Sequence, residues 1–106
     1  MRFKKFLMMG LMTVMFMQWC NVSAYPPHEN GGNRVTASGA IATEGRTVAA
    51  DHLNFGDKVI INGKEYVVED RFGGGYTNRI DIFMENYHDA IQFGRRSMEV
   101  QVVKKK

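Results

Sequence analysis

The sequence is poor in the residues that cross-link chains or bind metals, because its 106 residues contain one cysteine and three histidines. A single cysteine excludes an internal disulfide. The histidines, at positions 28, 52 and 88, lack the spacing of a zinc site. We therefore expect neither a disulfide framework nor a metal site.

Long apolar runs and internal repeats are also missing. The one extended apolar run, residues 6–19, is shorter than the roughly 20 residues that a membrane-spanning helix needs. The rest of the chain shows no repeat and no pattern of a long helix, and its two prolines stand together at positions 26 and 27. One small core must then supply nearly all the stability of the domain.

Residues 1–24 have the pattern of a secretion signal. Basic residues at positions 2, 4 and 5 precede the apolar run, and residues 22–24 (VSA) provide the small residues of a cleavage site. We expect cleavage after Ala24 and export to the periplasm, the cell wall or the extracellular space. A retained anchor is disfavoured because the run is short, and lipidation of Cys20 is disfavoured because bulky Trp19 stands beside it.

Removal of residues 1–24 changes the charge of the chain. Three of its 14 basic residues and none of its 11 acidic residues lie in this segment, so the remaining 82 residues carry no net charge. A nucleic-acid partner is therefore not expected, and the membrane is expected to be met only through the signal. Residues 25–106 are predicted to form one monomeric domain, free of cysteine as suits an oxidising compartment.

Short strands separated by turns are predicted for this domain. The pattern of apolar residues predicts strands over residues 47–50, 57–61, 64–68, 79–84 and 97–103. Asn62-Gly63 is the sequence of a two-residue hairpin turn, which needs positive φ at both positions. Residues 25–33 are expected to be a lead-in arm, and residues 104–106 a solvated tail. This composition favours an all-β fold, a small β-barrel of five or six strands.

One short helix is predicted over residues 86–93. Asn86 is the expected N-cap, Gly94 the expected stop, and Ala90, Ile91 and Phe93 the expected apolar side. The pair at positions 95 and 96, both arginine, has two interpretations: the side chains cap this helix through its carbonyls, or they neutralise an anionic ligand.

Two carboxylates, Asp70 and Asp81, flank a glycine cluster at positions 73–75. Glycines allow close approach of the backbone to a ligand, and two carboxyl groups in one cleft favour a protonated form suited to general acid catalysis. The structural alternative is that these are turn residues accepting backbone hydrogen bonds. Calcium binding by Asp51, Asp70 and Asp81 is disfavoured, because the dense ligand spacing of a calcium loop is missing.

Six sequence blocks resemble the three-aspartate "3D" domain family. They are residues 36–39 (TASG), 45–51 (GRTVAAD), 55–56 (FG), 68–71 (VEDR), 78–83 (NRIDIF) and 90–96 (AIQFGRR). The resemblance spans nearly all of residues 25–103. It implies a six-stranded double-psi β-barrel related to the catalytic barrel of membrane-bound lytic transglycosylase A.

The resemblance also implies a function and a site. Asp81 is implied as the catalytic acid with Asp70 as its helper, and cleavage of peptidoglycan glycan strands to 1,6-anhydro ends is implied as the reaction, with no cofactor. Substrate-binding or supporting roles are expected for Asp51, Gly73, Gly74, Tyr76, Asn78 and Arg79. Phe72 and Tyr76 are either sugar-stacking faces or packing residues. A non-catalytic peptidoglycan-binding module and an exported protein-interaction domain are the alternatives.

Overall fold

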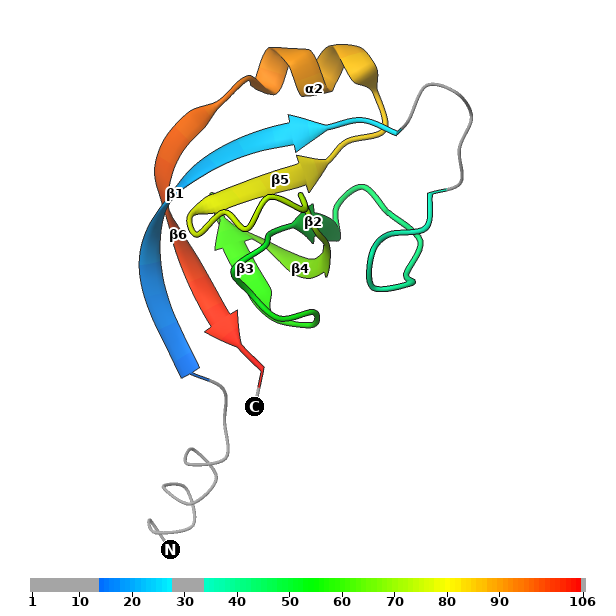
Figure 1. The fold of residues 1–106 in the computed structure, drawn as a ribbon. Coiled ribbons are helices and arrows are strands. Elements are labelled where there is room, and N and C mark those ends of the chain that lie inside the picture. Colours follow the sequence, from blue (N-terminus) through cyan, green and yellow to red (C-terminus); the bar gives the residue numbers. More distant parts are fainter. Residues whose placement is uncertain (1–13, 28–33, 106) are drawn as a thin grey trace, which may run out of the picture.

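The computed structural model describes residues 14–27 and 34–105, which form a closed barrel of six strands with one short helix (Figure 1). The order around the barrel is β1-β5-β2-β4-β3-β6. The elements are β1 (Val14–Tyr25), β2 (Thr47–Ala49), β3 (Lys58–Ile61), β4 (Lys64–Asp70), β5 (Arg79–Phe83), α2 (Tyr87–Phe93) and β6 (Arg96–Lys104). The predicted all-β barrel is confirmed.

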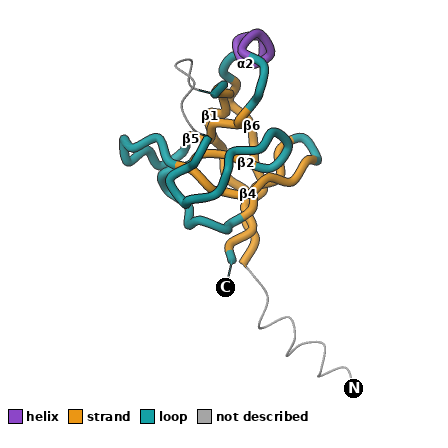
Figure 2. Tube along the Cα trace, turned by 90° about the vertical axis from the view of Figure 1, so that its right-hand side faces the viewer, coloured by secondary structure: helices purple, strands orange, loops and turns teal. Residues whose placement is uncertain are grey.

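Two parallel strand pairs distinguish this barrel from a simple up-and-down meander. β1 runs parallel to β5 and β2 runs parallel to β4, whereas the other neighbouring pairs are antiparallel. Parallel neighbours need long crossover connections, so strands distant in sequence lie side by side. The tube in Figure 2 shows the resulting loops wrapped around the strands. This arrangement agrees with the double-psi topology expected from the resemblance.

The interior is filled by β-branched side chains at alternate positions of the strands. In β3 and β4, buried Val59, Ile61, Tyr66 and Val68 alternate with more exposed neighbours, as expected where one face of a strand meets the core. The fully buried side chains of the core cluster include Val22, Val48, Val59, Val68, Ile80, Val100 and Val102. Each fully buried valine contributes about 1.5–3 kcal/mol relative to exposure.

Local signals in the sequence correctly predicted the hairpin. β3 and β4 are joined by Asn62 and Gly63 with φ of 52° and 81°, the two positive values that a type I′ turn requires. Glycine adopts this conformation without steric cost, and asparagine is the side chain that tolerates it best.

The predicted caps of the helix are confirmed. The side chain of Asn86 accepts a hydrogen bond from the Asp89 amide at 2.9 Å, and Gly94 ends α2 with φ of 69°. Arg96 Nε donates to the Phe93 carbonyl at 3.2 Å, so one of the two arginines has the capping role.

The expected apolar side of this helix was partly wrong. Ala90 is buried, whereas Ile91 is 60% exposed. A helix of seven residues resting on a barrel presents one narrow stripe to it, and Ile91 lies outside that stripe.

β1 is the main difference from the sequence-based expectation. Residues 14–24, predicted to lie in a removable signal outside the fold, form a strand of the barrel in which Cys20 and Val22 are fully buried. Within the described residues, no helix is long and apolar enough to cross a membrane. Cleavage after Ala24 is a processing step and stays a prediction, but it would remove nearly all of β1.

A buried carboxylate holds the C-terminal strand. Asp57 is completely buried. It accepts hydrogen bonds from the Asn54 and Lys105 amides, each at 2.8 Å, and forms an ion pair with Lys104 at 2.9 Å. Burial opposes ionisation, but these donors outweigh it and lower the pKa of Asp57. The prediction of a solvated tail was therefore wrong for Lys104.

We expect a chain that starts at Tyr25 to show no cooperative unfolding transition, because β5 and β6 lose their common neighbour and the core loses Val22. A chain that starts at Val14 is the control and should unfold cooperatively. Chemical denaturation followed by circular dichroism measures both, and equal transitions in the two chains would contradict the structural role assigned to β1.

Candidate functional site

The strands bring Asp70 and Asp81 to opposite sides of β2. Ala49 in β2 is in register with Asp81 of β5 on one side and with Asp70 of β4 on the other. Two strand spacings separate the aspartate Cα atoms, which is about 10 Å. The predicted pair is thus gathered at one region of the barrel surface.

Asp81 lies on the outer side of β5, as its alternation with buried Ile80 and Ile82 predicts. Its carboxylate accepts a short hydrogen bond from the hydroxyl of Ser23, which is its register partner in β1. Burial is the largest influence and raises the pKa of Asp81 above its usual range, with a smaller contribution in the same direction from the charge of Asp70.

A hydrogen bond and two positive charges limit the rise in the pKa of Asp81. The Ser23 hydrogen bond and the guanidinium groups of Arg79 and Arg95 favour the ionised form of Asp81 without reversing the shift. Of the two arginines at positions 95 and 96, Arg95 is therefore the one whose charge acts on a carboxylate of the site.

Asp70 is surrounded by donors of the protein itself. Its Oδ1 atom accepts from the Ala37 and Arg71 amides, and its Oδ2 atom accepts from the Tyr25 hydroxyl, all at 2.9 Å. Burial and the neighbouring Asp70 raise the pKa of Tyr25, so this phenol stays protonated and donates. Asp70 joins β1, β4 and the loop after residue 34.

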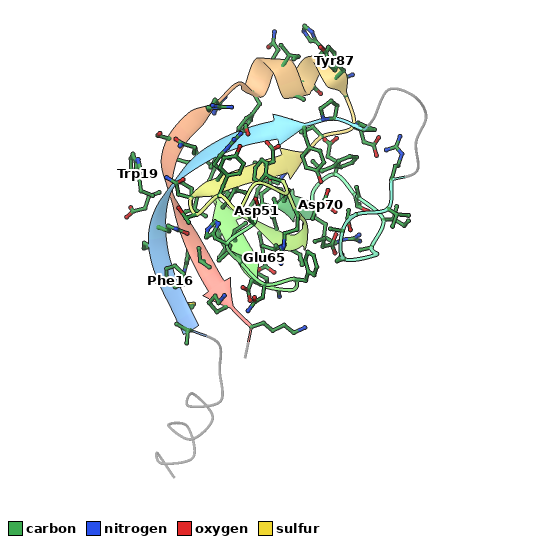
Figure 3. The ribbon with its side chains drawn as sticks, viewed as in Figure 1. Phe16, Trp19, Asp51, Glu65, Asp70 and Tyr87 are labelled. Carbon is green, nitrogen blue, oxygen red and sulfur yellow. The ribbon has the colours of Figure 1, made fainter. Side chains whose placement is uncertain are left out.

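Asp51 organises the glycine cluster. Its carboxylate accepts hydrogen bonds from five consecutive backbone amides, residues 72–76, at 2.7–3.2 Å. Burial opposes ionisation, but the amides outweigh it and lower the pKa of Asp51 to about 2. The backbone hydrogen bonds that the structural alternative predicted for Asp70 and Asp81 are also present at Asp70, which accepts from two amides; Figure 3 labels Asp51 and Asp70.

The glycines serve this carboxylate. Gly73 and Gly75 have φ of 95° and 71°, which turns their amides inward, and the amide of Gly74 is also occupied. A methyl group on Gly74 would lie 2.5 Å from the ring of Tyr76. The expected supporting role of Gly73 and Gly74 is thus a structural one: their amides hold the loop to Asp51.

Aromatic rings and an arginine form the outer part of this loop. Phe72 and Tyr76 meet edge to face at 5.5 Å, and the guanidinium of Arg79 lies 4.8 Å and 4.6 Å from their ring centres. Phe72 is half-buried, whereas Tyr76 is 43% exposed and presents ring surface to solvent. Asn78 is exposed, and its carbonyl accepts from the Asn21 amide of β1 at 2.8 Å.

A small cavity lies beside Asp70 rather than between the two aspartates. Its volume is about 50 Å³, far below the roughly 300–1,000 Å³ typical of ligand pockets. The lining residues are Tyr25, Pro26, Pro27, Arg34, Val35, Thr36, Ala42, Asp70 and Phe83. A sugar ring does not fit inside, so a glycan would have to bind along the open surface.

His52 follows Asp51 in the chain and contacts β1. Its Nε2 atom is 2.9 Å from Oε1 of Gln18 in β1, whereas its buried Nδ1 atom has no hydrogen-bond partner among the described residues. Burial lowers the pKa of His52, and the charge of Lys104 lowers it further.

Within residues 14–27 and 34–105, no group of three or more histidine, cysteine or acidic side chains is placed to hold a metal ion. His28 lies outside the described residues.

β1 contributes to the site, which the sequence alone did not predict. Ser23 contacts Asp81, Tyr25 contacts Asp70, and Gln18 contacts both His52 and the Thr77 carbonyl. The alternation of buried Val22 with Ser23 and Tyr25 could have indicated a strand, but the apolar run before it led to the prediction of a signal peptide.

No protein-family model and no curated protein matches the chain.

We expect Asp51→Asn to lose about 1.5–3 kcal/mol at neutral pH, the typical value of hydrogen bonds to a charged group. Because the folded state lowers the pKa of Asp51 to about 2, its contribution to stability is complete above the usual aspartate pKa and is lost as the pH falls toward 2. The destabilisation by the substitution should therefore shrink between pH 4 and pH 2. Urea unfolding across this range measures it, and a constant difference would contradict the assignment.

Proposed function

We propose that this protein cleaves peptidoglycan glycan strands as a lytic transglycosylase, with Asp81 as the catalytic acid. The observation that carries the proposal is the contrast among the three aspartates. Asp51 and Asp70 are held by several protein donors, whereas the described residues supply Asp81 with one hydroxyl donor and burial that raises its pKa. A carboxyl group in this state can hold a proton and deliver it.

The reaction needs one group that first donates and then accepts a proton. The Asp81 carboxyl protonates the oxygen that links N-acetylmuramic acid to N-acetylglucosamine, and the bond from this oxygen to C1 breaks. The resulting Asp81 carboxylate then takes the proton of the C6 hydroxyl while the C6 oxygen attacks C1. The products are a free sugar hydroxyl and a 1,6-anhydro end, and the acid is regenerated.

This chemistry suits a site with one carboxyl group that can gain and lose a proton. Hydrolases of the two-carboxylate type need a second group to activate water or to form a covalent intermediate. Here the nucleophile is part of the substrate, so Asp70 can act through its charge, which raises the pKa of Asp81. Arg79 and Arg95 stabilise the carboxylate that exists between the two proton transfers.

The exposed ring of Tyr76 is the best candidate for a sugar contact. Its neighbour Arg79 lies against the ring and carries donors suited to sugar hydroxyls. An open binding surface is compatible with a polymer that has no end to insert. The same shallow surface also favours the second candidate function, a peptidoglycan-binding module that does not cleave.

We expect Asp81→Asn to reduce the release of anhydro-muropeptides by about 100-fold to 10,000-fold, the usual cost of losing a general acid. Mass spectrometry of purified peptidoglycan after incubation measures this release. Asp89→Asn, a change at an exposed aspartate of α2, is the matched control and should keep full activity. No release by any variant, with all of them sedimenting with the glycan, would reject the enzyme in favour of the binding module.

We expect Ser23→Ala to move the basic limb of the rate–pH profile to higher pH, since the lost hydrogen bond favoured the ionised form of Asp81. Ser23→Thr keeps the hydroxyl and should restore the original profile. A lower rate with an unshifted profile in Ser23→Ala would mean that Ser23 serves the fold only.

A further inference from the structure

The first half of β1 carries a row of exposed apolar side chains on the outside of the barrel. Met15, Met17 and Trp19 stand at alternate positions on one side of the strand and are 60%, 55% and 62% exposed, while Val14 and Phe16 on the other side are also exposed, at 57% and 40%. Figure 3 shows Trp19 projecting away from the barrel. Three large apolar groups in a row on one strand exceed the scattered exposure that a protein surface normally shows.

The row continues sideways across the neighbouring strands. Met15 is in register with Val103 of β6, Val103 with Lys58 of β3, and Lys58 with Val67 of β4. Register partners point to the same face of a sheet, so apolar and amine groups share this surface. A cleft of about 440 Å³ lies there, lined by Gly56, Lys58, Val67, Val103 and Lys105. We call Met15, Met17, Trp19, Val103 and Lys105 the β1–β6 face.

Lysines lie at one end of this face. Val14 is in register with Lys104, so the start of β1 lies beside Lys104 and Lys105, as Figures 1 and 2 show for the two strands. The 13 residues that precede β1 carry three further basic residues and no acidic one. Three acidic groups lie near the face: Glu65 is paired with Lys58 at 3.1 Å, Asp57 is paired with Lys104 at 2.9 Å, and Glu99 is the register partner of Trp19.

This combination has the chemistry of a membrane interface. Apolar side chains and tryptophan enter the boundary between head groups and acyl chains, and lysines extend their ammonium groups to lipid phosphates. We propose that the β1–β6 face docks on an anionic phospholipid bilayer, and that residues 14–24 stay in the working protein as its membrane-facing strand. The proposal goes beyond the peptidoglycan activity and does not depend on it.

The single tryptophan of the chain makes the docking directly measurable. In vesicles of phosphatidylcholine and phosphatidylglycerol, we expect the emission of Trp19 in the full chain to shift to shorter wavelength and to be quenched by brominated lipid. Vesicles of phosphatidylcholine alone should bind more weakly. Lys105→Gln should weaken partitioning by about fivefold.

Substitutions within the face separate docking from insertion of the preceding residues. Met15→Ser combined with Met17→Ser should abolish the quenching of Trp19, whereas Ile91→Ser, which changes an equally exposed apolar residue on α2, should leave it intact. Quenching that survives the double methionine substitution would overturn the proposal, because the residues before β1 would then be responsible.

Two further results would also overturn it. Concentration-dependent sedimentation without vesicles, abolished by the same methionine substitutions, would make a second copy the occupant of the face. An intact mass for the exported protein that begins at Tyr25 would show that the face is removed. A mass that includes residues 14–24, together with quenching that depends on the two methionines, would support the proposal.

Discussion

A barrel closes only if its first strand is hydrogen-bonded along both edges, and β1 achieves this by changing its neighbours along its length. Residues 14–22 pair with β6, and residues 21–25 pair with β5. The overlap is short, so β1 acts as a bridge between two strands that would otherwise be open edges. The burial of Cys20 and Val22 places this bridge in the core itself.

The same strand explains how the site is held. Ser23 and Tyr25 lie two residues apart on β1 and therefore point to the same side, where one reaches Asp81 and the other Asp70. Rigid strands position side chains more accurately than loops do. The glycine loop, which would otherwise be mobile, is fixed by a carboxylate that accepts five of its amides. Asp51, Asp70 and Asp81 thus lie in different environments, because their hydrogen-bond donors differ.

The sequence predicted the elements whose causes are local. Asn62-Gly63 marks its own turn, Asn86 and Gly94 mark the ends of their helix, and alternation identifies Asp81 as outward-facing. What it could not show depends on distant partners. The apolar residues of β1 satisfy the pattern of a secretion signal as well as that of a strand, and the strand depends on pairing with β5 and β6, which are distant in the sequence. Asp57 is likewise an ordinary turn aspartate until Lys104 and Lys105 arrive from the other end of the chain.

β1 precedes both of its barrel neighbours in the chain, and this order has a consequence for synthesis. Ser23 and Asp81 are 58 residues apart, and the strands that flank β1 are the last two to leave the ribosome. Contacts this distant in sequence form late and slowly. Until β5 and β6 have been made, β1 has neither of its barrel neighbours, and the side chains of Cys20 and Val22 have no core to enter. The strand that completes the barrel is thus made before the strands that bury it.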